Sequence, residues 1–455
     1  MNRRMKSVYF ENLGCAKNQV DAEVMAHRLE KAGMTIAEDS DKADLIIVNT
    51  CGFIESAREE SVNTFFELRN QYPGAKIILA GCLSQRYADE LEKELPEADA
   101  IFGNRDLNQI TQLVSILENK QENQDALQSP FRLTPDYPDP DSEDDTRNRL
   151  FNYPGSAFLK ISEGCNHRCG YCAIPLIRGS LRSRPMRAVI QEAGRLVREG
   201  IKEINIVAQD LAAYGYDFDG KSHFAELLKA LDSIDGDFAI RMLYIHPDWM
   251  TDEIITTIKD CRKVMHYFDI PFQHASAHLL LPMKRTGNQE TYANLVEKIR
   301  TAMPDSVIRT TIMLGFPGDC EEDFEIVHSF IKRCRFTWMG SFIYSLEEDT
   351  PAFDMTTEQE HKELCKKAAL WQKKLESTQQ KITNEALHEF IGRRLPVLIE
   401  EVMEDTAMAI GRTYAQAPEV DGLTVVNGRG MKAGCVYDCE IVRVNGIDLE
   451  AVKID

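Results

Sequence analysis

The 455-residue sequence has no long apolar run and no excess of positive charge. A membrane-spanning helix needs roughly 18–20 consecutive apolar residues, and no stretch approaches that length. No apolar segment follows the early arginines, Arg3 and Arg4, so we expect no signal peptide and a cytoplasmic protein. Lysine and arginine total 53 against 73 aspartate and glutamate residues, a net charge of −20. Because nucleic-acid-binding proteins usually carry a basic face, this balance favours a basic protein partner over RNA.

Cysteine, in contrast, is plentiful, with twelve residues. In a cytosolic chain of this size a disulfide framework is not expected, and cysteine clusters more often bind metal or act in catalysis. Half of the twelve fall into two patterned sets. The remaining six are expected to be packing residues, namely Cys261, Cys320, Cys334, Cys365, Cys435 and Cys439.

Length and patterning predict a multidomain α/β protein. Strands alternate with amphipathic helices over residues 5–120, which predicts an open parallel α/β sheet. Residues 121–150 are rich in proline and aspartate and predict an acidic linker. Six strand candidates separated by helical stretches within residues 151–383 predict a partial (β/α)6 barrel of the TIM type. Five short strands within residues 386–455 predict a small antiparallel β-barrel of the OB kind.

Three cysteines stand close together in the stretch SEGCNHRCGYC, directly after the first strand of the predicted barrel: Cys165, Cys169 and Cys172. A cubane 4Fe–4S cluster normally takes four thiolates, so three can hold three irons and leave the fourth iron open. An open iron can chelate an amine and a carboxylate, such as those of S-adenosylmethionine (SAM). A zinc site is the alternative, but zinc usually takes four ligands in paired spacing, which suits this short loop less well.

The second set is Cys15, Cys51 and Cys82, each placed where a predicted parallel strand gives way to the loop before a helix. Ligands of open α/β sheets bind outside the carboxyl ends of the strands. The three thiols are therefore expected to converge, and the helix N-termini would favour a negatively charged group. Alternatively, each is a small buried hydrophobic residue, a common role of cysteine. Their equivalent placement favours a second three-cysteine cluster.

With both sets of cysteines, the sequence resembles the methylthiotransferase family of radical SAM enzymes along nearly its whole length. The matching stretches include NLGCAKNQVDAE, NTCGFIESAREES, GCLSQRY, EGCNHRCGYCAIPLIRGSLRSRP, DIPFQHASAHLLLPMKR and TTIMLGFPGDCEEDF. The resemblance implies a radical SAM barrel, a C-terminal TRAM domain and two 4Fe–4S clusters. It also implies that SAM serves as both methyl donor and radical source. The catalytic cysteines would be Cys165, Cys169 and Cys172, whose cluster cleaves SAM, while the other cluster presents sulfur.

Two branches of this family compete, one acting on a tRNA adenosine and the other on an aspartate of small-subunit ribosomal protein S-twelve. The stretches VAQDLAAYG, RMLYIHPD and GRTYAQAPEVDG resemble the second branch. Residues 390–455 hold seven lysines and arginines against eleven acidic residues, which suits a basic protein better than phosphates. We therefore expect methylthio addition to the β-carbon of an aspartate in ribosomal protein S-twelve, free or within the small ribosomal subunit. The tRNA reaction and a non-catalytic iron–sulfur scaffold remain alternatives, and the enzyme would need an electron donor such as flavodoxin or ferredoxin.

Residues that follow the predicted barrel strands are candidates for SAM contacts, because barrels bind ligands at the carboxyl ends of their strands. They are Gln209, Asp210 and Tyr214 after the second strand, Gln273 after the fourth, and Gly315 and Gly318 after the fifth. Glycines there would let the backbone approach the cofactor. For each of these residues, ordinary loop structure is the alternative. Four arginines form either a carboxylate-binding set or a solvated basic loop: Arg178, Arg182, Arg184 and Arg187.

Overall fold

The computed structural model describes residues 5–120, 130–137, 147–404 and 406–454. These residues form two compact units. The first contains the described residues up to Phe151, together with Gly164–Asn166 and Ala173–Ser180, and the second contains the remainder. Two pieces from the middle of the chain therefore belong to the N-terminal unit.

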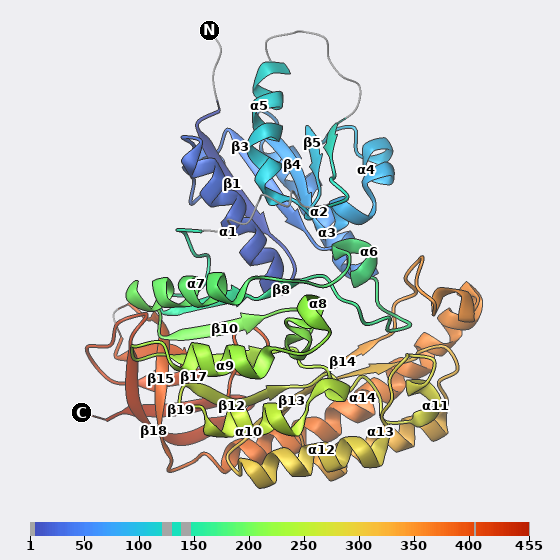
Figure 1. Cartoon of the computed structure of the whole chain (residues 1–455), viewed down its shortest axis with the longest axis vertical. Helices are drawn as coiled ribbons and strands as arrows, with labels where there is room; N and C mark the ends of the chain where they lie inside the picture. Colours follow the sequence, from blue (N-terminus) through green and yellow to red (C-terminus); the bar gives the residue numbers. More distant parts are fainter. Residues whose placement is uncertain (1–4, 121–129, 138–146, 405, 455) are drawn as a thin grey trace. The chain divides into compact units, whose positions relative to one another are not determined.

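A six-stranded parallel sheet forms the N-terminal unit, in the order β2-β1-β3-β4-β5-β6 (Figure 1). The strands are β1 (Ser7–Asn12), β2 (Thr35–Ile36), β3 (Leu45–Thr50), β4 (Lys76–Gly81), β5 (Ala100–Phe102) and β6 (Phe131–Leu133). The helices are α1 (Ala16–Lys31), α2 (Glu55–Gln71), α3 (Cys82–Arg86), α4 (Ala88–Glu94) and α5 (Ile110–Lys120). The predicted open parallel α/β sheet is confirmed.

Both faces of this sheet are buried, which explains why its central strands are continuous apolar runs. Ile47 of β3 packs into a core with Leu29 of α1 and Leu113 of α5. Its neighbour Val48 faces the other way, into a core with Phe65 of α2. Successive side chains of a strand point to opposite faces, so β3 supplies both cores.

Most of the predicted linker, residues 121–129 and 138–146, lies outside the described residues. Within the linker range, β6 pairs in parallel with β5 and adds an edge strand to the N-terminal sheet. Near the end of the linker range, Arg147 forms a buried ion pair with Glu23 of α1. The backbone N–H of Phe151 also donates to Glu23, at 2.8 Å, so this buried carboxylate anchors the end of the N-terminal unit.

The second unit contains the predicted (β/α)6 arrangement, a parallel sheet in the order β14-β13-β12-β11-β10-β7. Its strands are β7 (Ser156–Lys160), β10 (Glu203–Val207), β11 (Ala239–Leu243), β12 (Val264–Asp269), β13 (Val307–Leu314) and β14 (Trp338–Ile343). A short antiparallel pair, β8 (Ser162–Glu163) and β9 (Arg182–Ser183), follows β7. Neighbours in the sheet are also neighbours in sequence, and within the described residues β7 and β14 do not pair, so the barrel is open.

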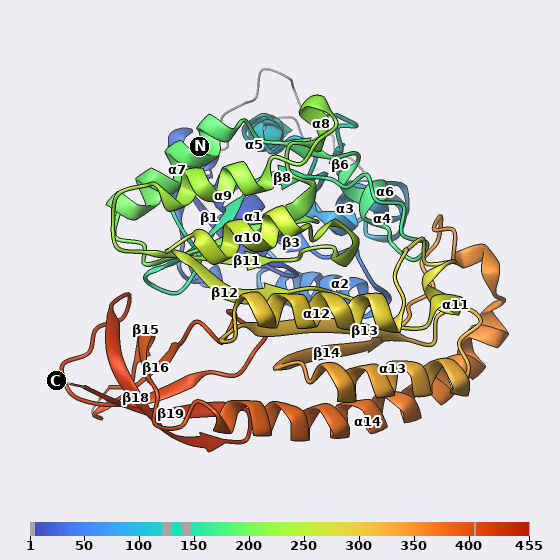
Figure 2. The same cartoon turned by 60° about the horizontal axis from the view of Figure 1, so that its bottom comes forward.

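Helices connect these strands as the alternation predicts. The long ones are α7 (Met186–Arg198), α9 (Phe224–Asp232), α10 (Asp252–Asp260), α12 (Gln289–Ala302), α13 (Glu321–Cys334) and α14 (Glu358–His388). Figure 2 shows α12, α13 and α14 beside one another. A capping box at Thr357 and Glu360 starts α14, the 31-residue helix that leads to the C-terminal strands. None of the helices in the described ranges combines the length and apolar character needed to cross a membrane.

Five strands close the C-terminal barrel in the order β15-β16-β17-β19-β18. They are β15 (Arg394–Val402), β16 (Met408–Arg412), β17 (Thr424–Asn427), β18 (Val436–Asn445) and β19 (Asp448–Lys453). The small barrel is confirmed, but it is not antiparallel throughout, because β17 and β19 pair in parallel. An odd number of strands cannot alternate direction around a closed ring, so one pair must be parallel.

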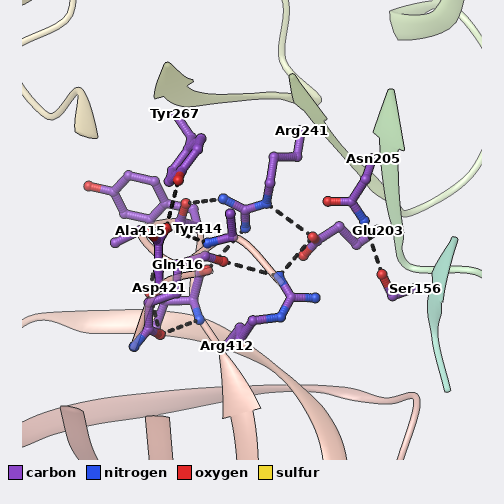
Figure 3. Close-up of polar contacts among 12 residues, drawn as sticks. Ser156, Glu203, Asn205, Arg241, Tyr267, Arg412, Tyr414, Ala415, Gln416 and Asp421 are labelled. Atoms are coloured by element: carbon purple, nitrogen blue, oxygen red, sulfur yellow. Dashed lines mark hydrogen bonds and ion pairs between the residues drawn. The ribbon is translucent and has the colours of Figure 1, made fainter. Parts of the chain in front are cut away.

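Buried polar contacts fix the C-terminal barrel to the (β/α)6 sheet, as Figure 3 shows. Glu203, the first residue of β10, accepts hydrogen bonds from Arg241 of β11 at 3.1 Å and from Arg412 of β16 at 2.9 Å. Trp338, the first residue of β14, donates its indole N–H to the carbonyl oxygen of Ala415 at 2.6 Å. The C-terminal barrel thus contacts the amino ends of β10 and β14. The carboxyl ends of these strands, where ligands of such folds bind, lie at the opposite edge of the sheet.

Candidate functional site

The three N-terminal cysteines stand at the ends of three adjacent strands. Cys15 directly precedes α1, Cys51 follows β3, and Cys82 opens α3 after β4. Because β1, β3 and β4 are neighbours and run parallel, their carboxyl ends share one edge of the sheet. The structure therefore brings these three loops together, although 36 and 31 residues separate the cysteines in sequence.

Two glycines allow the loops to approach closely. A Cβ added to Gly14, which has a φ of +97°, would lie 3.1 Å from the Cβ of Cys51 and 3.5 Å from its Sγ. A Cβ added to Gly52 would lie 2.7 Å from the backbone of Leu83, next to Cys82. A side chain at Gly52 would thus clash with the backbone beside Cys82, and one at Gly14 would crowd the side chain of Cys51.

Asparagine side chains cross-link the same loops. Asn18 of α1 donates its amide N–H groups to the carbonyl oxygens of Leu13 and Thr50, at 3.1 and 3.0 Å. Asn49 of β3 donates to Asn18 and also to Asn12, which ends β1. Buried amides that satisfy backbone carbonyls in this way hold the loops around the cysteines in a fixed arrangement.

The sulfur of Cys82 lies in a polar pocket formed by side chains of the N-terminal unit. Asn104 donates an N–H to the Cys82 Sγ at 3.3 Å, and the Sγ lies 3.3 Å from the Oδ1 of Asn18. Arg178 donates an N–H to the same sulfur at 3.5 Å. Burial raises the pKa of the Cys82 thiol to about 12 against the lowering effect of Arg178. Burial also raises the pKa of Cys51, so a metal bound by both thiols would have to displace their protons.

The chemistry of these donors fits an iron–sulfur cluster better than a single metal ion. Among the described residues, no three His, Cys, Asp or Glu side chains are arranged to hold one metal ion. A single zinc ion would need ligands within about 2.3 Å of one point, whereas a cubane spreads three thiolates over three irons. The N–H groups that face the Cys82 sulfur are the donors that a negatively charged cluster requires.

Cys165 belongs to the N-terminal unit, and Cys169 and Cys172 belong to the second unit. The N–H of Cys165 donates to the carbonyl oxygen of Gly179 at 3.1 Å. The N–H of Cys172 donates to the carbonyl oxygen of Cys169 at 3.1 Å, so this part of the loop forms a tight turn. These three cysteines remain the predicted ligands of a SAM-cleaving cluster, because they lie within one eight-residue stretch of chain.

Buried contacts fix the turn between Cys169 and Cys172. Gly170 donates its N–H to the carbonyl oxygen of Met283 at 3.1 Å. The hydroxyl of the buried Tyr171 accepts a hydrogen bond from Arg285 at 3.1 Å. This loop is therefore held by the residues that follow α11 (Ala277–Leu280).

Asp210, a predicted cofactor contact, hydrogen-bonds the part of the triplet loop that belongs to the second unit. One carboxylate oxygen lies 2.7 Å from the Nε2 of His167, which stands between Cys165 and Cys169 in sequence. The other accepts the backbone N–H groups of Ala212 and His246 at 3.1 and 3.0 Å. The His167 ring stacks on that of His246 with a centroid separation of 4.5 Å, and burial lowers the pKa of His246 to about 3.

Two predicted cofactor contacts carry buried polar atoms that lack a protein partner. Neither amide atom of Gln209, just beyond β10, has a hydrogen-bond partner in the described part of the chain. The same holds for the Oε1 of Gln273, a residue with an unfavourable φ of +69°. Orphaned buried polar groups and strained backbone occur preferentially at functional sites. These two residues therefore remain candidates for SAM contacts.

The remaining predicted contacts have structural partners. Tyr214 is buried and donates its hydroxyl to the carbonyl oxygen of Arg184 at 2.8 Å. Gly315 has a φ of +75°, and a Cβ added there would lie 2.9 Å from Ala368 of α14, so its small size serves helix packing. A Cβ added to Gly318, which has a φ of +93°, would meet only the ring of His278, at 3.9 Å. Its loop remains open to a ligand.

Asp319 is a residue that the sequence analysis missed. One of its carboxylate oxygens accepts the N–H of Gly315 at 2.8 Å, while the other is buried and has no partner among the described residues. Burial, reinforced by the nearby Asp323, raises the pKa of Asp319 to about 7. Its place in the glycine loop was visible in sequence, but its burial was not.

A cavity of about 370 Å³ between α12 and α13, lined by Arg300 and Cys334 among others, lies away from the carboxyl end of β13.

Three family models match the chain in order. They are "Uncharacterized protein family UPF0004" over residues 7–103, "Radical SAM superfamily" over residues 159–331 and "TRAM domain" over residues 391–454. The first covers β1 to β5 of the N-terminal sheet and its three cysteines. The second covers the triplet and most of the (β/α)6 sheet, and the third covers the C-terminal barrel.

Curated relatives match over nearly the full length and carry the name "Ribosomal protein uS12 methylthiotransferase RimO". The relative from Treponema denticola is 39% identical over 97% of this chain and 99% of its own length. That from Acetivibrio thermocellus is 39% identical over 98% and 97% of the two chains. That from Thermotoga maritima is 40% identical over 92% and 93%.

Solved structures share the fold at low identity. TsrM from Kitasatospora setae, a radical S-adenosylmethionine methyltransferase with cobalamin and a 4Fe–4S cluster bound, aligns with a TM-score of 0.54. It is 14% identical over 77% of each chain. OxsB, a cobalamin-dependent S-adenosylmethionine radical enzyme, aligns with a TM-score of 0.51 at 10% identity, over 81% of this chain and 56% of its own.

Proposed function

The chain belongs to the RimO family of radical SAM methylthiotransferases, and on that premise we propose that it adds a methylthio group to the β-carbon of an aspartate in ribosomal protein uS12. The observation that carries this proposal is the near-full-length identity of about 39% to uS12 methylthiotransferases. It extends through all three domains, including the N-terminal sheet that carries Cys15, Cys51 and Cys82.

The proposal assigns one iron–sulfur cluster to each set of cysteines. Cys165, Cys169 and Cys172 would hold the cluster whose open iron binds SAM. Cys15, Cys51 and Cys82 would hold a second cluster at the edge of the N-terminal sheet, supported by the convergence of their loops and by the donors around Cys82. When bound, the clusters and SAM would supply the radical that removes a hydrogen atom and the sulfur and methyl group that replace it.

The protein's own side chains would position these groups. Asp210 and His167 would hold the triplet loop, as their 2.7 Å contact indicates. Gln209 and Gln273 would offer their orphaned amide atoms to polar groups of SAM. The cleavage of SAM needs an electron, which we assign to a small carrier such as flavodoxin or ferredoxin.

The test is a complete reaction with purified components. Both clusters are reconstituted anaerobically, and SAM, a reductant, sulfide and purified uS12 are added. Peptide mass spectrometry is then expected to find one methylthio group in place of one hydrogen, on an aspartate of uS12. The same reaction with tRNA as the acceptor serves as the control.

The products of the reaction show which of the three candidate functions is correct. A modified aspartate supports both the reaction and its target. Unmodified uS12 alongside modified tRNA would assign the chain to the tRNA branch. Absence of SAM cleavage, with intact clusters verified by iron and sulfide analysis, would contradict the enzymatic role and favour an iron–sulfur scaffold.

A further inference from the structure

Arg178 is a buried cation that belongs to the N-terminal unit although it follows Cys172 by only six residues. It ends α6 (Ile174–Arg178), and its side chain is 2% exposed. Its Nη2 donates to the Oδ1 of Asn18 at 2.7 Å, to the Oδ2 of Asp21 at 2.9 Å and to the Sγ of Cys82 at 3.5 Å. The stretch of chain that carries the triplet thus delivers an arginine to a cysteine of the other set.

The rest of the N-terminal unit holds α6 in this position. Arg105 donates to the carbonyl oxygens of Leu176 at 2.6 Å and Ile177 at 3.1 Å. Ala173 and Ile177 pack directly against Cys82 in a small apolar cluster. The helix that carries Arg178 is therefore fixed beside Cys82 by packing and hydrogen bonds on several sides.

Cys82 also differs from the two cysteines beside it. Backbone N–H groups of Lys17 and Asn18 face the thiol of Cys15, and the N–H of Phe53 faces that of Cys51. Cys82 instead receives side-chain N–H groups from Asn104 and from the charged Arg178. Hydrogen bonds to ligand sulfurs and nearby net charge are two of the factors that set the reduction potential of an iron–sulfur cluster.

Burying a guanidinium is unfavourable unless it is paired, and Asp21 provides that pairing. Asp21 balances the charge of this guanidinium in the cluster-free protein. Three thiolates around an iron cluster would add further negative charge beside it. Reduction adds another negative charge, so a neighbouring cation stabilises the reduced state more than the oxidised state.

We propose that Arg178 is a positioning residue that hydrogen-bonds Cys82 and raises the reduction potential of the cluster at Cys15, Cys51 and Cys82. This inference rests on the second cluster assigned under the proposed function. Arginine suits the task because its guanidinium stays charged when buried and is more weakly hydrated than the ammonium of lysine.

The test isolates the N-terminal cluster in the full-length protein. Cys165, Cys169 and Cys172 are replaced together by alanine, and this parent is reconstituted anaerobically. Its midpoint potential is then measured by redox titration monitored by electron paramagnetic resonance. Arg178→Met and Arg178→Lys are made in the same parent. The matched control is Arg187→Met, which removes an exposed arginine from the same stretch of chain.

Arg178→Met is expected to lower the midpoint potential, Arg178→Lys to lower it less, and Arg187→Met to leave it unchanged. Asp21→Asn removes the negative partner while keeping the guanidinium, so it should raise the potential. A merely structural role would not shift these two sites in opposite directions. If Arg178→Met fails to bind iron, Asp21→Asn decides, since an unchanged potential there overturns the proposal.

Measurements on the parent protein distinguish a failure of the two-cluster assignment from a failure of the role proposed for Arg178. A parent that binds no iron would overturn the two-cluster assignment and this inference with it. A loaded parent whose potential is the same with and without the Arg178 guanidinium would overturn the inference alone.

Discussion

Arg412 of the C-terminal barrel lies 2.9 Å from Glu203 of the central sheet, and both side chains are only 3% exposed. Burial alone would raise the pKa of Glu203, but the charges of Arg241 and Arg412 lower it to about 2. The carboxylate is thus ionised at neutral pH. It links β10 and β11 of the central sheet to β16 of the C-terminal barrel. The C-terminal barrel is an integral part of the second unit because this ion pair is buried.

We expect Arg412→Met to destabilise the protein strongly. The substitution removes one of the two cations from a buried carboxylate, and breaking such a pair costs about 3–5 kcal/mol. Urea unfolding monitored by circular dichroism of the cluster-free protein measures the loss. Arg443→Met is the matched control, because Arg443 lies 3.9 Å from Glu450 at the surface. Its cost should stay below about 1 kcal/mol, and equal costs for the two variants would contradict the role of the buried pair.

Asp319→Asn should change how stability depends on pH. The pKa of Asp319 is raised to about 7 in the folded protein, so the folded state holds a proton that the unfolded state releases near pH 4. Wild-type stability should therefore fall, relative to Asp319→Asn, as pH rises from about 4 to about 7, and the difference should then stay constant. Thermal unfolding of both proteins across this range tests the prediction, which parallel pH curves would contradict.

Gln209→Met should weaken SAM binding without destabilising the protein. Its two amide atoms have no partner among the described residues, so their loss leaves no new unsatisfied group in the fold. If SAM satisfies them, the dissociation constant should rise by about tenfold or more, while the melting temperature stays the same or increases. Calorimetric titration of SAM into the loaded protein provides the measurement, with the exposed Gln71→Met as control. Unchanged affinity would remove Gln209 from the site.

Single cysteine variants should separate the two proposed clusters. Cys169→Ala is expected to abolish SAM cleavage, seen as the loss of 5′-deoxyadenosine and methionine. Cys51→Ala should leave SAM cleavage intact and abolish methylthiolation of uS12. Chromatography of the small products and mass spectrometry of uS12, run on the same reactions, report both. Native methylthiolation by Cys51→Ala would show that the assigned roles are wrong.

The apolar and polar pattern of the sequence predicted the strands, the helices and the loops between them. The strand ends at Cys15, Cys51 and Cys82 were visible because parallel strands between helices are short, apolar and regularly followed by polar loops. The closure of the C-terminal barrel followed from its short strands. The parallel pairing of β17 and β19 did not, because strand direction depends on the closed ring as a whole.

Long-range contacts escaped prediction. Nothing near Asp21 indicates that its partner lies 157 residues away. Asp210 was predicted as a SAM contact because polar residues after barrel strands often bind ligands, but its hydrogen bonds to His167 and to two backbone N–H groups were not visible in the sequence. The three-residue β6 carries too few residues for its alternation to stand out beside an acidic, proline-rich stretch.

The position of Arg178 also has a consequence for how the chain matures during synthesis. The strands of the N-terminal sheet are complete at Leu133, but the cation that pairs with Asp21 emerges 157 residues after it. At about 5–20 residues per second, a growing chain spends roughly 8–30 s with that carboxylate lacking its arginine. The N-terminal sheet therefore cannot adopt its final arrangement around Cys82 until the loop of the triplet has left the ribosome. The proposed iron site at Cys15, Cys51 and Cys82 would therefore take its final form only after the triplet cysteines have been made, so the loading of the two proposed sites need not follow the order of the cysteines in the sequence.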